Sequence, residues 1–237
     1  MLSVVIPCYN EEERLPATVD AIKRYLGARG DRYELILADD GSVDGTQKVI
    51  AAAMAGASNV RNVHLVQNRG KGRALAEGVA VSKGDRILLT DADLSTPIEE
   101  LPKLEAKLDS GAGVAIASRS IKGSEVVVSQ PVYRVLMGKT FNLMVQALLL
   151  PGLWDTQCGF KLFKGDLARS VFADMRTNGF GYDPEALFLA KKRGARIAEV
   201  PVVWRHSAPT KVAAIRHSVD MFKDLVGVRF RRYAPSR

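Results

Sequence analysis

The chain has 237 residues, of which 47% are hydrophobic, and a formal net charge of +8. That length and composition suffice for a full hydrophobic core and favour one large α/β domain over two small ones. The positive charge predicts an anionic partner, such as nucleotide phosphates, an acidic membrane surface or nucleic acid.

Cysteine usage and the apolar segments bear on the compartment. Cys8 and Cys158 lie far apart with no CxxC pairing, so neither a disulfide framework nor a zinc site is indicated. The N-terminus enters an apolar run at residues 2–6 without the features of a signal peptide, and no segment has about 18 uninterrupted apolar residues. We therefore expect a cytoplasmic protein without a transmembrane span.

Short apolar runs alternate with helical patterns in the first part of the chain. Strands are predicted at residues 2–6, 33–38, 62–66 and 85–90, and helices near 12–28, 45–56 and 72–82. Strands rich in Val, Ile and Leu that alternate with helices predict an α/β fold with a mostly parallel central sheet and helices on both faces. Active sites in such sheets lie at the carboxyl ends of the strands.

The second part of the chain is less regular. We predict a strand at 113–118, a loop at 120–130, an amphipathic helix at 131–150, a helix near 183–193 and a strand at 198–204. Residues 205–237 carry eight Lys or Arg against two Asp. The pattern predicts a domain over residues 1–204, followed by a basic amphipathic extension of the same domain over residues 205–237.

Two carboxylates, Asp91 and Asp93, come after the fourth strand. Period-two alternation would point both side chains the same way, so that they could share one cation that prefers oxygen ligands, Mg²⁺ or Mn²⁺. The structural alternative is that they finish the strand and cap the segment after it.

Asp39 and Asp40 come after the second strand, in the sequence DDGSVDGT. An ordinary turn needs only one of these carboxylates. The other can accept a hydrogen bond from the N–H of a nucleobase such as uracil.

The segment NRGKGR, residues 68–73, precedes a predicted helix and brings three cations to its N-terminus. Backbone N–H groups and the helix dipole make such a position favourable for phosphate, with Lys71 and Arg73 as candidate ligands. The segment is not a Walker A loop, and the first strand is not followed by the glycines of a dinucleotide fingerprint. Both absences argue against an ATPase and against an NAD-dependent enzyme.

Four motifs in this order resemble family-2 glycosyltransferases of the GT-A fold. They are PCYNEE after the first strand, DDGSVDGT after the second, DAD after the fourth, and DTQCGFKLF beyond the middle of the chain. With GYDPEALFLAKKRGARIAEVPVVW, the last motif resembles the branch that glycosylates polyprenyl phosphates, and among its members the dolichyl-phosphate glucosyltransferases most.

The resemblance implies a role for individual residues. For the donor nucleotide, the candidates are Pro7, Tyr9, Glu11, Asp39, Asp40, Lys71, Arg73, Asp91 and Ala92. Asp91 and Asp93 would hold a Mg²⁺ or Mn²⁺ ion that bridges the diphosphate. Arg119, Arg134, Arg205 and Lys211 would bind the acceptor phosphate, with a solvated basic surface as the alternative. Asp93, Asp155 and Arg119 are the catalytic candidates.

The implied reaction is an inverting transfer of a hexose from a nucleotide sugar, UDP-glucose first and GDP-mannose second, to a polyprenyl phosphate. An ionised phosphate acceptor needs no strong general base. If the acceptor were instead a sugar hydroxyl, a base would be required, and Asp155 is the candidate. Its structural alternative is a loop carboxylate that caps nearby amides.

A polyprenyl acceptor implies contact with a membrane. We expect peripheral attachment, on the cytoplasmic face, through the apolar side of residues 131–150 and through Val219, Phe222, Leu225 and Val226 of the basic segment. The alternative is that both helices pack on the core or on a second copy in a homodimer. A nucleic-acid-binding module is disfavoured, because carboxylates at the strand ends would repel a phosphate backbone.

Overall fold

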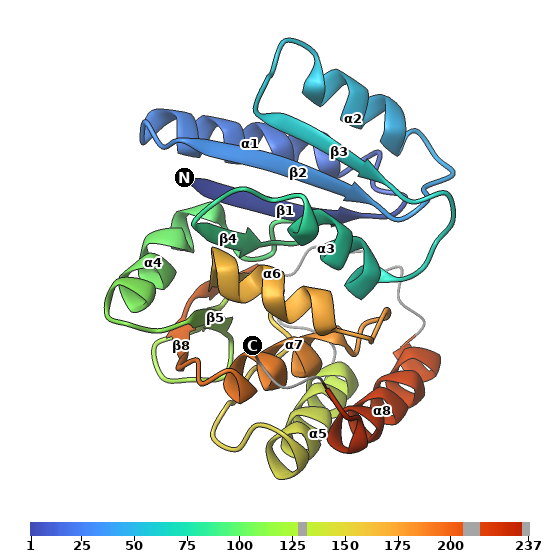
Figure 1. Cartoon of the computed structure of the whole chain (residues 1–237), viewed down its shortest axis with the longest axis vertical. Helices are drawn as coiled ribbons and strands as arrows, with labels where there is room; N and C mark the ends of the chain where they lie inside the picture. The colour runs from blue at the N-terminus through green and yellow to red at the C-terminus, as the bar shows by residue number, and fades with distance from the viewer. Residues whose placement is uncertain (128–131, 206–213, 234–237) are drawn as a thin grey trace.

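The structure, a computed structural model, describes residues 1–127, 132–205 and 214–233. It is a three-layer α/β arrangement in which helices cover both faces of one sheet (Figure 1). The strands of this sheet are β1 (Leu2–Cys8), β2 (Tyr33–Asp39), β3 (Val60–His64), β4 (Arg86–Leu89), β5 (Val114–Ser118), β7 (Lys161–Lys164) and β8 (Ile197–Pro201). The helices are α1 (Leu15–Ala28), α2 (Thr46–Met54), α3 (Lys71–Ala80), α4 (Leu101–Asp109), preceded by a short 3₁₀ turn (Ile98–Glu100), α5 (Val132–Leu148), α6 (Gly165–Asp174), α7 (Tyr182–Lys192) and α8 (Ala214–Phe230).

The strand order is β3-β2-β1-β4-β7-β5-β8, and every neighbouring pair is parallel except the two that involve β7. Side chains of β1 alternate between two hydrophobic cores: Val4 and Ile6 pack with α1, α2 and α4, whereas Val5 packs with α3 and α5 to α8. Because both faces are buried, the central parallel strands β1, β4 and β5 are nearly continuous apolar runs, whereas the edge strand β3 is partly exposed and carries polar residues. The predicted mostly parallel sheet with helices on both faces is confirmed.

The strand β7 was not predicted. It is only four residues long and begins and ends with lysine, so its sequence lacks the apolar run of the other strands. It is nevertheless central and antiparallel, and Lys161 pairs with Leu89 of β4 and Ile116 of β5. Because β7 runs backwards, the start of this strand lies at the same edge as the ends of β4 and β5.

Two other expectations need correction. The segment predicted as a loop at 120–130 contains a short strand, β6 (Glu125–Val126), which pairs in parallel with β9 (Val203–Trp204), and residues 128–130 lie outside the described residues. The strand predicted at 198–204 is divided between β8 and β9, which belong to different sheets.

The C-terminal helix α8 packs against α5 and α7 (Figure 1). Leu225, which we expected at a membrane surface, is buried in the core instead, whereas Val219, Phe222 and Val226 are exposed. Among the described helices, none has the length and hydropathy to cross a bilayer.

Candidate active site

The carboxyl ends of β2, β1 and β4 are neighbours in the sheet, so the three acidic motifs meet at one edge. Two links tie them together. Asp40, after β2, accepts hydrogen bonds from the backbone N–H groups of Arg69 (2.8 Å) and Gly70 (2.7 Å), directly before Lys71, whose Nζ lies 2.6 Å from Asp91 Oδ1 after β4.

The second link runs through Arg14, a residue that the sequence analysis did not single out. Its Nε and Nη2 donate to the Glu11 carboxylate at 2.7 and 2.6 Å, and its Nη1 lies 4.0 Å from Asp93 Oδ2. Arg14 therefore connects the segment after β1 to the segment after β4. Its position one helical turn after Glu11 is the only sequence signal that would have indicated this pairing.

Asp39 is fully buried, and its two oxygens accept hydrogen bonds from three side chains. They are Ser42 Oγ on Oδ1, and Gln47 Nε2 and His64 Nδ1, the latter at 2.8 Å, on Oδ2. Asp39 thus organises the loop after β2. Burial raises the pKa of the neighbouring Asp40 carboxyl above its ordinary value, although the two backbone N–H groups oppose this shift.

The segment before α3 needs glycine. Gly70 has φ +104°, and a Cβ there would lie 2.5 Å from the carbonyl oxygen of Asn178. Helix α3 then starts at Lys71, so that its N-terminal N–H groups and Lys71 face the acidic edge together. Arg73 instead pairs with Glu77 on the same helix, and its Nε is buried with no hydrogen-bond partner among the described residues.

Asp91 and Asp93 lie in a turn, because β4 ends at Leu89. The strand alternation from which we inferred a shared direction therefore does not extend to them. Asp93 Oδ1 accepts a hydrogen bond from the Ser95 N–H (3.0 Å), and the carbonyl oxygen of Ser95 accepts one from the Arg205 N–H (2.8 Å). This places the backbone of Arg205 beside the acidic turn.

Gly159, in the DTQCGFKLF motif, packs directly on Asp91. A Cβ at this position would lie 2.5 Å from Asp91 Cγ, which is far inside van der Waals contact. Burial alone would raise the pKa of the Asp91 carboxyl, but the nearby cations Lys71, Lys161 and Arg119 outweigh it and hold that pKa below its ordinary value. The acidic turn is therefore surrounded by positive charge.

Lys161 is the second functional candidate that the sequence analysis missed. Its side chain is 1% exposed, donates to the carbonyl oxygen of Cys158 (2.5 Å) and pairs with Asp183 at the start of α7. A buried ammonium with a buried carboxylate partner costs desolvation free energy unless both groups are well hydrogen-bonded. The pair fixes the Cys158–Gly159 segment against α7. In the sequence, the only indication of a role for this lysine is its place in the motif DTQCGFKLF.

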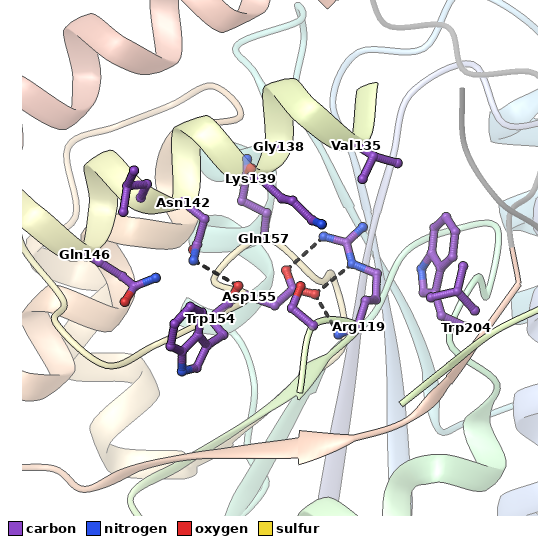
Figure 2. Close-up of a pocket in the computed structure, with 13 residues that line it drawn as sticks. Arg119, Val135, Gly138, Lys139, Asn142, Gln146, Trp154, Asp155, Gln157 and Trp204 are labelled. Atoms are coloured by element: carbon purple, nitrogen blue, oxygen red, sulfur yellow. Dashed lines mark hydrogen bonds and ion pairs between the residues drawn. The ribbon is translucent and has the colours of Figure 1, made fainter. Parts of the chain in front are cut away.

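A cavity of about 780 Å³ opens beside Arg119 (Figure 2). Arg119 binds the buried carboxylate of Asp155 through its backbone N–H (2.8 Å), Nε (2.7 Å) and Nη2 (2.8 Å), and its guanidinium lies 5.4 Å from the Trp204 ring centroid. The walls combine the cations Arg119 and Lys139, the polar side chains Ser120, Asn142, Gln146, Asp155 and Gln157, and apolar groups from Val126, Val135, Gly138, Leu143, Trp154 and Trp204.

Tyr9 and Ala92, two other predicted site residues, take no part in the contacts described above. Tyr9 is exposed at the end of β1, beyond Pro7, and Ala92 is buried with its carbonyl oxygen accepting a hydrogen bond from Thr18 Oγ1 (2.6 Å). Arg134 lies in the first turn of α5, and Lys211 falls outside the described residues.

Within the described residues, no group of three or more His, Cys, Asp or Glu side chains is arranged to hold a metal ion. Any metal site at this edge would therefore rest on two carboxylates, completed by ligand or solvent oxygens.

Comparisons with known proteins identify the family of this chain. The family described as Glycosyl transferase family 2 matches residues 3–172. The dolichyl-phosphate beta-glucosyltransferase of Dictyostelium discoideum is 36% identical over 97% of this chain and 74% of its own length. The human and Saccharomyces cerevisiae proteins of the same name are 37% identical over 97% of this chain (75% of their own) and 32% identical over 96% (74%), respectively.

Among solved structures, glucosyl-3-phosphoglycerate synthase from Mycobacterium tuberculosis, in complex with Mn²⁺, UDP and phosphoglyceric acid, superposes with a TM-score of 0.74. The match covers 98% of this chain and 79% of that protein at 22% identity, and it shows a shared fold. The chain has the GT-A fold and is a glycosyltransferase that belongs to glycosyl transferase family 2.

Proposed function

We propose that this chain transfers glucose from UDP-glucose to a polyprenyl phosphate of the dolichyl phosphate type, with inversion at the anomeric carbon. One observation carries the proposal: a cavity with Arg119 and Lys139 in its partly apolar wall lies close enough to the acidic turn for the Arg119 charge to lower the pKa of Asp91. An acceptor that consists of a phosphate and an apolar chain matches both the cationic and the apolar side chains of this wall. The names of the similar eukaryotic proteins support the same acceptor class.

The donor would bind along the edge formed by β2, β1 and β4. Because Asp39 is fully buried and accepts hydrogen bonds from Ser42, Gln47 and His64 on both oxygens, we expect it to shape the nucleoside pocket from beneath. Asp40 accepts two backbone hydrogen bonds and can offer its remaining lone pairs to the base. Pro7, Tyr9 and the Glu11 segment would line the same pocket. Lys71 and Arg73, at the start of α3, would face the diphosphate.

Asp91 and Asp93 fit a divalent cation in the chemistry of their donors. Both offer carboxylate oxygens, and Asp91 already attracts one cation, the Lys71 ammonium. A bound Mg²⁺ or Mn²⁺ would supply positive charge for the departing diphosphate. The mycobacterial structures solved with Mn²⁺ and UDP support this choice of cofactor. Gly159 and Arg14 would hold the two carboxylates in place.

The acceptor phosphate would bind at Arg119 and Lys139, with Arg134, Arg205 and Lys211 as further cationic candidates. Asp155 is unsuited to act as a general base, because Arg119 occupies both of its oxygens. Burial opposes ionisation of Asp155, but the charge and hydrogen bonds of Arg119 outweigh it and hold the pKa of this carboxyl below its ordinary value. A phosphate monoester, with a second pKa near 6, needs no such base. This favours a phosphate over a sugar hydroxyl as the nucleophile.

The acceptor class implies attachment to a membrane surface. Exposed apolar side chains gather on the adjacent helices α5 and α8: Tyr133, Val135, Leu136, Leu143, Val219, Phe222, Val226 and Phe230. With the basic C-terminal segment, they would anchor the protein peripherally to anionic lipid. Leu136→Glu with Leu143→Glu should reduce binding to anionic vesicles, whereas Met54→Glu on the distant helix α2 should not. Equal binding of all three proteins would contradict the attachment.

Calorimetric titration with UDP and with GDP tests the donor half of the proposal. We expect UDP to bind in the presence of Mn²⁺, to bind much more weakly in chelator, and to lose the metal-dependent part in Asp93→Ala. Tighter binding of GDP would favour the second donor, GDP-mannose. Absence of binding by either nucleotide would refute the transferase site as described.

A further inference from the structure

Asp91, the carboxylate proposed to hold a metal ion, already pairs with a cation of the chain itself. Lys71 Nζ lies 2.6 Å from Asp91 Oδ1, and the Lys71 side chain is only 22% exposed. An ammonium and a divalent cation that touch the same oxygen would lie within a few ångströms of one another and would repel strongly in a partly buried site. The ammonium and the divalent cation therefore cannot both bind Asp91 with full affinity.

The Asp91 carboxylate has little freedom to serve two cations by turning. Gly159 packs against one side of it, so closely that a Cβ would overlap the carboxylate atoms. Lys71 occupies Oδ1, and 35% of the Asp91 side chain remains exposed. An incoming cation therefore meets a carboxylate that is held in place and already partly neutralised.

Lys71 has a second place to go within the site. It is the first residue of α3, whose N-terminal N–H groups form the proposed diphosphate position. While bound to Asp91, its ammonium also lies 5.8 Å from the centroid of the Tyr182 ring, so this aromatic face borders the site on the lysine's side. The long side chain can therefore exchange a carboxylate for a phosphate without leaving the site.

We propose that Lys71 and the divalent cation compete for Asp91, and that the nucleoside diphosphate ends this competition by drawing the Lys71 ammonium onto its own phosphates. The inference rests on the proposed metal and donor roles of this edge. It makes metal binding conditional on the nucleotide: the divalent cation binds weakly by itself and tightly with the diphosphate. By linkage, the metal strengthens nucleotide binding by the same factor.

The test measures the binding of Mn²⁺ alone, from the electron paramagnetic resonance signal of the free ion, before and after addition of UDP. Lys71→Met removes the ammonium and keeps the apolar stem against Tyr182. We expect it to bind Mn²⁺ alone about tenfold more tightly than the unmodified protein and to gain less affinity when UDP is added, a coupling of ordinary size. Lys71→Arg, which keeps the charge, should retain weak binding of Mn²⁺ alone.

Two control variants make the outcome specific. Lys48→Met removes the same charge from an exposed position on α2, outside the proposed site, so its Mn²⁺ affinity should change little. Asp91→Asn should lose Mn²⁺ binding with and without UDP. Unchanged or weaker Mn²⁺ binding by Lys71→Met would overturn the inference, as would equal tightening in Lys48→Met, which would indicate a general charge effect.

Failure of the proposed function gives a different pattern. If the unmodified protein takes up no Mn²⁺ even with UDP, or if Asp91→Asn binds it fully, then Asp91 does not hold the metal and the inference falls with that role. If the unmodified protein binds Mn²⁺ with UDP through Asp91 while Lys71→Met shows no gain alone, only the competition is refuted.

Discussion

Arg119 makes three hydrogen bonds to the buried Asp155 and thereby joins the end of β5 to the segment after α5. The backbone N–H, Nε and Nη2 of Arg119 all donate to the Asp155 carboxylate, which is 5% exposed. The pair fixes the guanidinium at the wall of the cavity while its outer edge remains available to an anion (Figure 2). Asp155 is thus a positioning residue for Arg119.

Removal of this carboxylate should be costly for stability. In Asp155→Asn the guanidinium loses its charged partner, and we expect the free energy of unfolding to fall by about 3 kcal/mol. Denaturant unfolding followed by circular dichroism would measure the loss. A variant as stable as the unmodified protein would show that Arg119 does not depend on Asp155.

The same pair predicts how stability depends on pH. Because the folded-state pKa of Asp155 lies below its ordinary value, its contribution is fully present above the unfolded pKa of about 3.9 and is lost as pH falls through the folded pKa. The difference in unfolding free energy between the unmodified protein and Asp155→Asn should therefore stay constant from neutral pH to about pH 5 and shrink below about pH 4. A difference that changes near neutral pH would contradict this assignment.

Gly159 should be necessary for metal-dependent nucleotide binding. In Gly159→Ala the new methyl group must displace the Asp91 carboxylate, and we expect Mn²⁺-dependent UDP affinity to fall by about tenfold or more, as for other groups that orient metal ligands. Binding of UDP in chelator should change much less. Gly27→Ala on α1, where a Cβ meets nothing within 4 Å, is the matched control and should bind like the unmodified protein.

Lys139 should contribute to acceptor binding. Lys139→Met keeps the stem in the cavity wall but removes the charge, and we expect the KM for the lipid phosphate to rise about fivefold or more, as for loss of a charge-assisted hydrogen bond. UDP binding should be unchanged. The control is Lys107→Met, on the exposed side of α4; if both variants show the same KM, Lys139 has no part in the site.

Much of the fold could be predicted because the central parallel strands are buried on both faces and their sequences are nearly continuous apolar runs. The antiparallel β7 could not, since it consists of four residues with a lysine at each end, and the charge of the buried Lys161 is neutralised by Asp183, more than twenty positions later. A partner that distant leaves no periodic trace in the sequence.

The candidate site, like the fold, could be predicted from the sequence only in part. Alternating strands and helices predict parallel strands, whose carboxyl ends lie at one edge of the sheet, so the position of the acidic motifs at that edge was predictable. The pairings of Lys71 with Asp91 and Arg119 with Asp155 were not, because residues so far apart in the sequence give no sign of which cation will neutralise which carboxylate. These pairings determine which carboxylates stabilise the fold and which remain available to a ligand.

The most direct test of the central claim is transfer of radiolabelled glucose from UDP-glucose to dolichyl phosphate in mixed micelles with Mn²⁺, with unphosphorylated dolichol as the matched acceptor. We predict label in the lipid fraction only with the phosphate, and its near-complete loss in Arg119→Ala. Label on unphosphorylated dolichol or on a soluble saccharide, or none from UDP-glucose while GDP-mannose labels the lipid, would contradict the account.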